Sequence, residues 1–111
     1  VAGGDEALGR IQEAPVTPSA VFCLSDVQAL GALFHAQREG ISIPRDLSVM
    51  GFDNLEWSAS STPGITTIEL PSETMGARAA DAMIDQLING VTAQPLALSA
   101  SIIERSSVRA L

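Results

Sequence analysis

Residues 43–54 read IPRDLSVMGFDN, and this stretch decides the fold class. Its apolar centre, residues 47–52, has the composition of a strand that is buried on both faces of a parallel sheet, and it ends at Asp53. A second apolar run, AVFCL at residues 20–24, predicts another strand of the same kind. Ser25 follows this run and opens the tetrapeptide SDVQ, which fits a capping box and therefore predicts that a helix begins there.

Helical and extended segments alternate along the rest of the chain. The other predicted helices cover residues 5–13 and 72–89, the helix that begins at Ser25 ends before Gly40, and further extended segments cover residues 65–68 and 96–105. Strands that alternate with helices are typical of α/β folds with a mainly parallel sheet flanked by helices. We therefore predict an α/β fold of this kind.

The chain has 111 residues, which suit a single domain, and a net charge of −7. A protein that binds duplex DNA needs a positive face that displaces counterions, so this segment by itself is not expected to bind DNA. Cys23 is the only cysteine, which excludes an internal disulfide and fits the cytoplasm. No apolar run reaches the roughly 20 residues that span a membrane, so no membrane partner is expected. Because the chain starts without methionine, we interpret it as part of a longer protein.

The sequence offers no set of residues for catalysis or metal binding. His35 is the only histidine and lies in a predicted helix, where a surface or rim position explains it better than a catalytic role. Cys23 lies within an apolar strand, which is typical of an inert core thiol. There is no CxxC or HExxH motif, and no phosphate-cradling glycine loop follows a strand. We therefore expect neither an enzyme nor a bound cofactor or metal.

Polar side chains follow the two predicted strands at their carboxyl ends, which is where ligands bind in open parallel sheets. Ser25 and Asp26 follow the first strand, and Asp53 follows the second. A carboxylate at such an edge can accept hydrogen bonds from two adjacent hydroxyls of a sugar or nucleoside. Ser25 is also explained as a helix cap, and Asp53 as part of a plain turn. Trp57 could stack on such a ligand, but packing of its loop or a subunit contact explains it better.

Several ordered segments resemble the lactose-repressor/galactose-repressor (LacI/GalR) family of bacterial transcription regulators. They are PSAVFCLSD and ALG within residues 18–31, the stretch at residues 43–54, PGITTI at residues 63–68, and ERSS at residues 104–107. The resemblance covers residues 3–107, in order and at family spacing. It implies the C-terminal portion of an effector-binding domain with a type I periplasmic-binding-protein-like fold. In that family a small effector, often a sugar or purine, binds between two subdomains, and a helix-turn-helix DNA-binding segment precedes the domain.

The resemblance also implies roles for individual residues. Asp53 matches the aspartate that holds effector hydroxyls or ring nitrogens, and Ser25 matches a position that faces the cleft. Leu70 falls where some sugar-binding members place a polar side chain, so their specificity cannot be copied to this chain. The helix from Val27 matches the side that pairs two subunits. The predicted homodimer interface comprises Val27, Leu30, Phe34 and Ser61.

The family resemblance implies a division of the chain between two subdomains. Residues 1–68 and 96–107 would belong to the C-terminal subdomain, whereas the helix at 72–89 would pack on an N-terminal subdomain that this chain does not contain. We expect such a chain to leave apolar faces uncovered, and to be stable only beside another chain or in a rearranged packing.

The leading hypothesis is the sensor of a sugar-responsive regulator, in which the effector favours one orientation of the subdomains and so controls operator binding. One alternative is the solute-binding protein of a sugar transporter, which uses the same fold but follows a signal peptide. Another is an α/β enzyme whose catalytic residues lie outside this chain. Residues 44–53 and the ending RSS at residues 105–107 favour the regulator.

Overall fold

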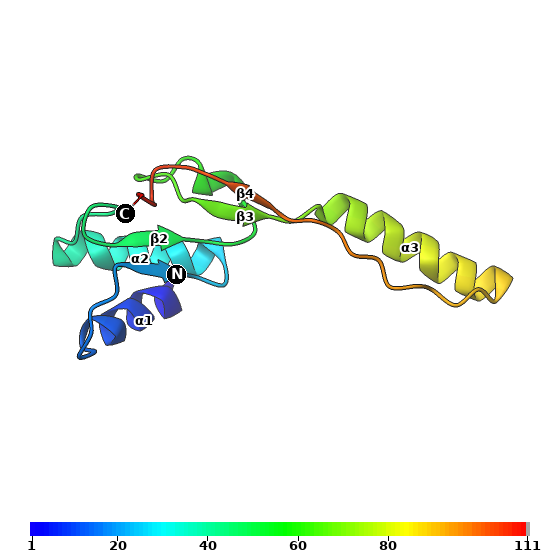
Figure 1. Ribbon diagram of the computed structural model, residues 1–111, viewed down its shortest axis with the longest axis horizontal. Helices are drawn as coiled ribbons and strands as arrows, with labels where there is room; N and C mark the ends of the chain where they lie inside the picture. The colour runs from blue at the N-terminus through cyan, green and yellow to red at the C-terminus, as the bar shows by residue number, and fades with distance from the viewer. Residues whose placement is uncertain (111) are drawn as a thin grey trace. The chain divides into compact units, whose positions relative to one another are not determined.

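The computed structural model describes residues 1–110, and it divides into two compact units (Figure 1). One unit comprises Val1–Glu69 together with the chain from Ile102 onward, and the other comprises Leu70–Ser101. The elements are α1 (Ala2–Gln12), β1 (Ala20–Phe22), α2 (Asp26–Glu39), β2 (Ser48–Met50), the 3-10 helix η1 (Glu56–Ser58), β3 (Thr67–Glu69), α3 (Ser72–Asn89) and β4 (Ser101–Ile103). Helices and strands alternate as predicted, and the α/β fold class is confirmed.

The strands of the first unit pair side by side, and the first two are parallel. β1 pairs with β2, with Val21 opposite Val49, and a parallel bridge joins Met50 to Thr66 just before β3. β3 in turn pairs with β4. Because β1 and β2 run in the same direction, the residues that follow them lie at one edge of the sheet. This edge is where the sequence predicts a ligand.

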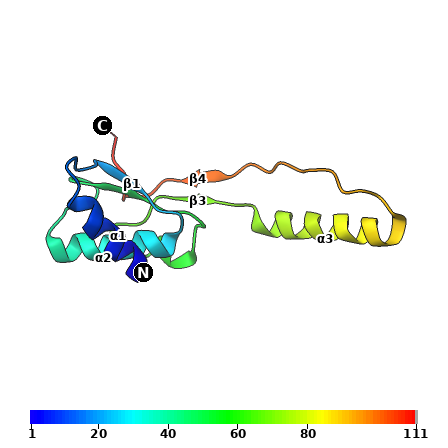
Figure 2. The same cartoon turned by 90° about the horizontal axis from the view of Figure 1, so that it is seen from below.

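Both strand predictions around this edge are too long. The runs at residues 20–24 and 47–52 form strands only at Ala20–Phe22 and Ser48–Met50, although Cys23 N still donates to the Met50 carbonyl over 2.8 Å. The prediction that the first run is buried on both faces is wrong, because Leu24 is 76% exposed. The physical reason is that α1 and α2 lie on the same side of β1 and β2 (Figure 2), so the described chain leaves the other face of β1 uncovered.

α2 begins and ends where the sequence predicts. Ser25 Oγ accepts a hydrogen bond from Gln28 N over 3.3 Å, and Gly40 closes the helix in the left-handed region with a φ of 71°. The capping box differs in its second bond, because Gln28 Oε1 accepts from Leu24 N rather than from Ser25 N. The buried face of α2 is made largely of small side chains, and the buried core comprises Leu8, Ala29, Ala32, Leu33, Ala36, Leu47, Val49 and Ile65.

α1 packs closely on α2, and both helices lie on the same side of strands β1 and β2 (Figure 2). The helix starts at Ala2 rather than at the predicted residue 5, so Gly3 and Gly4 form its first turn. A Cβ atom on Gly4 would lie 2.0 Å from the carbonyl oxygen of Gln28 in α2. The two helices therefore approach at backbone distance, which only glycine permits at this position.

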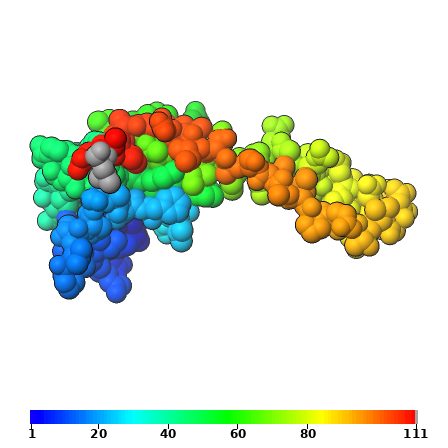
Figure 3. All heavy atoms as spheres, viewed as in Figure 1, coloured from blue at the N-terminus to red at the C-terminus, as the bar shows by residue number. Residues whose placement is uncertain are grey.

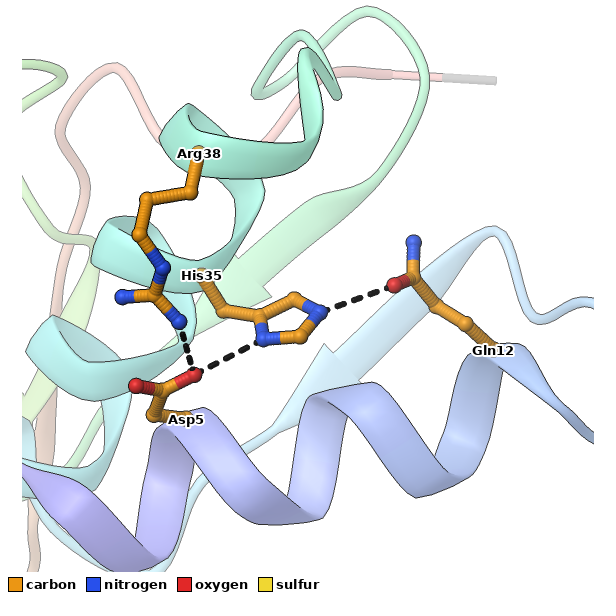
Figure 4. A network of polar contacts seen from close by, with 4 residues as sticks. All are labelled: Asp5, Gln12, His35 and Arg38. Atoms are coloured by element: carbon orange, nitrogen blue, oxygen red, sulfur yellow. Dashed lines mark hydrogen bonds and ion pairs between the residues drawn. The ribbon is translucent and has the colours of Figure 1, made fainter.

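A polar cluster beside this crossing joins the two helices (Figure 4). His35 Nδ1 lies 2.8 Å from Asp5 Oδ1, and His35 Nε2 lies 2.9 Å from Gln12 Oε1. Arg38 also donates to the Asp5 carboxylate. The side chain of His35 is only 13% exposed, so this histidine is a largely buried contact between helices. That position agrees with the rim role that the sequence indicates.

The cluster predicts that stability falls at acid pH. The hydrogen bond from Arg38, and after it that from His35, hold the pKa of Asp5 below its usual value of 3.8. A carboxyl with a lowered folded-state pKa stabilises the fold fully above the unfolded pKa, and the contribution is lost as pH falls through the folded pKa. Urea unfolding between pH 6 and pH 3 should therefore show a steeper loss for the wild-type protein than for Asp5→Asn. Equal pH profiles would contradict a stabilising role for Asp5.

The second unit consists of α3 and the extended segment that follows it, drawn in yellow-green, yellow and orange in Figure 3. α3 covers the predicted range and ends at Gly90, which has a φ of 66°. The segment after Gly90 returns along the helix, and a groove between them is lined by Met75, Ala79, Ala82 and Leu98 among others. No residue of α3 is buried, and its exposed apolar side chains include Met83, Ile84, Leu87 and Ile88.

Candidate effector-binding site

Asp53 lies at the carboxyl edge of the sheet, directly beyond β2. It is exposed, and its backbone N–H donates to the Ile68 carbonyl over 2.9 Å, which fixes it beside β3. Among the described residues, no group donates a hydrogen bond to its carboxylate. An exposed carboxylate with free lone pairs on a fixed backbone can accept hydrogen bonds from ligand hydroxyls.

The backbone at this point adopts two uncommon conformations in succession. Asp53 has a φ of 104° and Asn54 a φ of 49°, which for residues other than glycine costs roughly 1–3 kcal/mol each. Hydrogen bonds hold this turn in place: Asn54 N donates to Thr67 Oγ1 over 3.3 Å, and Leu55 N donates to Asp26 Oδ2 over 2.8 Å. Strained residues held in this way are typical of functional sites. The turn at Asp53, which the sequence could also explain as a plain turn, is therefore held by hydrogen bonds to Thr67 of β3 and Asp26 of α2.

Asp26 does not lie at the surface of this edge. Its side chain is fully buried and accepts hydrogen bonds from Leu55 N, from Ser58 Oγ and, over 2.6 Å, from Thr67 Oγ1. Gly51 makes room for it, since a Cβ atom there would lie 2.2 Å from Asp26 Oδ1. A ligand at the edge cannot reach this carboxylate, which corrects the prediction that Asp26 contacts the effector. The first residue of α2 instead points back beneath the turn that carries Asp53.

The other predicted ligand contacts lie in different surroundings. Ser25 is half-buried at the end of β1, where its Oγ serves as the cap of α2. Leu70 is half-buried and is the first residue of the second unit. Trp57 packs against the core and lines a groove together with Leu30 and Phe34 of α2. The structure thus places Trp57 beside the predicted dimer residues, in line with packing or a subunit contact.

The predicted dimer residues share one exposed surface of the first unit. Val27 and Phe34 are 39% and 44% exposed, and they lie on the side of α2 that the core does not cover. Leu30, Phe34 and Ser61 line the same groove as Trp57. α2 therefore has two apolar faces, of which the one made of alanines is buried and the one made of larger side chains is open.

Two residues of the RSS ending, for which the sequence predicts no contact, complete the edge. Arg105 donates from Nη2 to Asn54 Oδ1 over 2.6 Å and from Nη1 to the Ile65 carbonyl over 2.7 Å. Ser107 is fully buried, and its Oγ bridges Thr66 N and the Val49 carbonyl at 2.8 and 2.5 Å. Residues 105–107 therefore connect β2 to the segment just before β3 through hydrogen bonds. No local sequence signal predicts these contacts.

Within residues 1–110, no group of three or more His, Cys, Asp or Glu side chains could hold a metal ion. No helix in this part of the chain is both long and apolar enough to cross a membrane. Cys23 is half-buried, and burial raises the pKa of its thiol, which agrees with the inert role predicted for it.

Comparison with protein-family models identifies a match to the periplasmic binding protein-like domain over residues 2–108. The chain belongs to this family. It is 39% identical over 109 residues to the HTH-type transcriptional repressor CytR of Escherichia coli (strain K12), which covers 97% of this chain and 32% of that protein. The chain thus spans about a third of the length of this curated relative.

Solved structures that are similar to this chain agree with the fold. A LacI family transcriptional regulator from Enterococcus faecium, solved with bound ribose, is 26% identical with a TM-score of 0.86, over 99% of this chain and 41% of that one. The lac repressor dimer bound to operator and the anti-inducer ONPF has a TM-score of 0.89 over 98% of this chain and 38% of that one; at 24% identity it supports the fold alone. These relatives are transcriptional regulators rather than enzymes, so the predicted LacI-type resemblance is confirmed and the transporter and enzyme alternatives are not favoured.

Proposed function

We propose that this chain is the ligand-sensing part of a cytoplasmic LacI-type transcriptional regulator, and that Asp53 binds a small polyhydroxylated effector, a sugar or a nucleoside. The observation that carries the proposal is the exposed Asp53 carboxylate on a braced turn at the carboxyl edge of a parallel sheet. Ligands of open α/β sheets bind at this edge. The ribose bound by the Enterococcus faecium relative supports a ligand that carries adjacent hydroxyls.

The other residues of the edge have supporting roles in this proposal. Ser25 retains a hydroxyl at the end of β1 that can contact the same ligand while it caps α2. Asp26 acts from beneath, since it holds the turn after Asp53 through Leu55 N.

Effector binding changes the affinity for DNA only if the effector binds two conformational states of the protein with different affinities. An effector that binds one orientation of the subdomains more tightly shifts the population toward it by that difference in affinity. The segment described here is acidic, so operator contacts belong to a helix-turn-helix segment outside it. In the same scheme, the apolar side of α3 packs on the part of the regulator that precedes this chain.

Loss of the Asp53 carboxylate should weaken effector binding by about tenfold or more, because hydrogen bonds to a charged group are worth about 1.5–3 kcal/mol. Asp53→Gly removes the carboxylate, and glycine accepts a φ of 104° without strain. Isothermal titration of the intact regulator with a panel of aldoses, ribose included, and nucleosides measures the effect. Glu39→Ala, an exposed carboxylate at the far end of α2, is the matched control. Unchanged affinity in Asp53→Gly would remove Asp53 from the site.

The open face of α2 is proposed as one half of a homodimer interface formed by Val27, Leu30, Phe34 and Ser61. Phe34 is the largest side chain among them, so a charge at its position should raise the dimer dissociation constant by about thirtyfold or more. Sedimentation equilibrium of the intact Phe34→Asp regulator measures this change. Val16→Asp, which alters an 80% exposed side chain before β1, should leave the dimer intact. A Phe34→Asp variant that stays dimeric at low concentration would place the interface elsewhere.

A further inference from the structure

The side chain of Asn54 joins the two places where the chain leaves and re-enters the first unit. Asn54 Nδ2 donates to Glu69 Oε1 over 2.9 Å, and Arg105 Nη2 donates to Asn54 Oδ1 over 2.6 Å. Glu69 is the last residue before the second unit begins, and Arg105 lies three residues after the chain returns at Ile102. Since a carboxylate only accepts and a guanidinium only donates, these two partners also determine which way the amide points.

Arg105 is itself anchored to the residues that precede β3. Its Nη1 donates to the Ile65 carbonyl over 2.7 Å, and its backbone N–H donates to Thr66 Oγ1 over 3.0 Å. The planar guanidinium therefore connects a buried stretch of main chain to the Asn54 side chain in one rigid fork. A lysine at this position could make one of the two contacts but not both in the same geometry.

The bonds to Asn54 act on the conformation of Asp53. Both residues have positive φ angles, so this turn persists only because surrounding groups hold it. The backbone N–H of Asp53 donates to the Ile68 carbonyl, and the backbone N–H of Asn54 donates to Thr67 Oγ1. The Asn54 side chain adds the ties to Glu69 and Arg105. Without them, only the bonds from the two backbone N–H groups would hold the turn, so the direction of the Asp53 carboxylate would be less restricted.

We propose that Asn54 and Arg105 are positioning residues, which hold the Asp53 carboxylate in its binding orientation and make that orientation depend on the two segments that connect the units. This inference rests on the proposed effector-binding role of Asp53. Neither residue contacts the effector. A displacement of either connecting segment pulls on Asn54 and so changes the affinity of the site. An effector, in turn, favours the arrangement of the connecting segments in which Asn54 has both partners.

The first test replaces Arg105, whose guanidinium makes both contacts, with lysine, which can make only one of them. In the intact Arg105→Lys regulator, amide hydrogen exchange at Asp53 and Asn54 should become faster, while exchange within α2 stays unchanged. Affinity for the probes D-ribose and adenosine, measured by calorimetry, should fall about tenfold for whichever of them the wild-type protein binds. Arg45→Lys is the matched control, because among residues 1–110 the Arg45 guanidinium bonds only to the neighbouring Asp46 side chain, at the opposite end of β2. It should change neither quantity.

The second test uses rescue, which a merely structural role would not show. Asn54→Asp tolerates the positive φ but sets a carboxylate against Glu69, so probe affinity should fall. Adding Glu69→Gln supplies a donor to the new carboxylate, and affinity should return to within about threefold of wild type. Unchanged exchange at Asp53 and Asn54 in Arg105→Lys, or a double variant no better than Asn54→Asp, would overturn the positioning role. A wild-type protein that binds neither probe nor any other aldose or nucleoside would instead overturn the proposed function.

Discussion

Replacing Asp26 with alanine should lower the free energy of unfolding by about 3 kcal/mol or more. The buried carboxylate accepts from three donors, at Leu55, Ser58 and Thr67. Alanine would leave all three donors, two of which belong to buried residues, without an acceptor, and each unsatisfied buried group costs about 1–3 kcal/mol. The loss would also free the turn that carries Asp53, since Leu55 N would have no partner.

Guanidinium unfolding of the intact protein measures this loss as a shift of the transition midpoint at constant slope. Asp26→Asn keeps one acceptor oxygen, so it should lie between the wild-type protein and Asp26→Ala. Asp53→Asn changes an exposed acidic residue nearby and should shift stability by about 0.5 kcal/mol or less. If Asp26→Ala is no less stable than Asp53→Asn, the buried hydrogen-bond set does not support the edge.

Asp26 and Asp53 show what the sequence could and could not predict about the candidate site. Both follow an apolar strand, and the rule for open parallel sheets places both at the ligand edge. One residue faces solvent and the other the interior, and the difference depends on the side chains of Ser58 and Thr67, which lie 32 and 41 residues from Asp26. The local pattern therefore placed both residues beyond the strands, but it could not separate an exposed carboxylate from a buried one.

Helix ends that depend on nearby residues were predicted more accurately than contacts between residues far apart in the sequence. Ser25 and Gly40 determine the ends of α2 through contacts within one helical turn, and both ends are confirmed. The contacts of Ser107 with Val49, 58 residues away, depend on the finished fold. The predicted strand ends were wrong for a related reason. A strand ends where its pairing with the neighbouring strand ends, and the sequence of the strand alone does not show where that is.

α1 begins at Ala2 rather than at residue 5, and its first turn contains Gly3 and Gly4, although glycine is unfavourable in a helix. The structure explains only one of these two glycines. Gly4 touches the backbone of α2, whereas nothing lies within 4 Å of a Cβ atom placed on Gly3. Glycine weakens a helix by about 1 kcal/mol relative to alanine. The cost is thus tolerated at Gly4 because it permits the close approach of the helices, and Gly3 has no such compensation.

Gly4→Ala should therefore destabilise the protein by about 3 kcal/mol, because the new methyl group would meet the Gln28 carbonyl oxygen at 2.0 Å and the helices must separate. Gly3→Ala, one residue away in the same helix, should stabilise it by up to about 1 kcal/mol. Guanidinium unfolding of both variants measures the two opposite shifts. The separation of the helices in Gly4→Ala should also break the contact between His35 and Asp5, which the NMR shifts of the His35 ring report. Shifts of the same sign in the two variants would show that helix propensity, and not the crossing of α1 and α2, governs this turn.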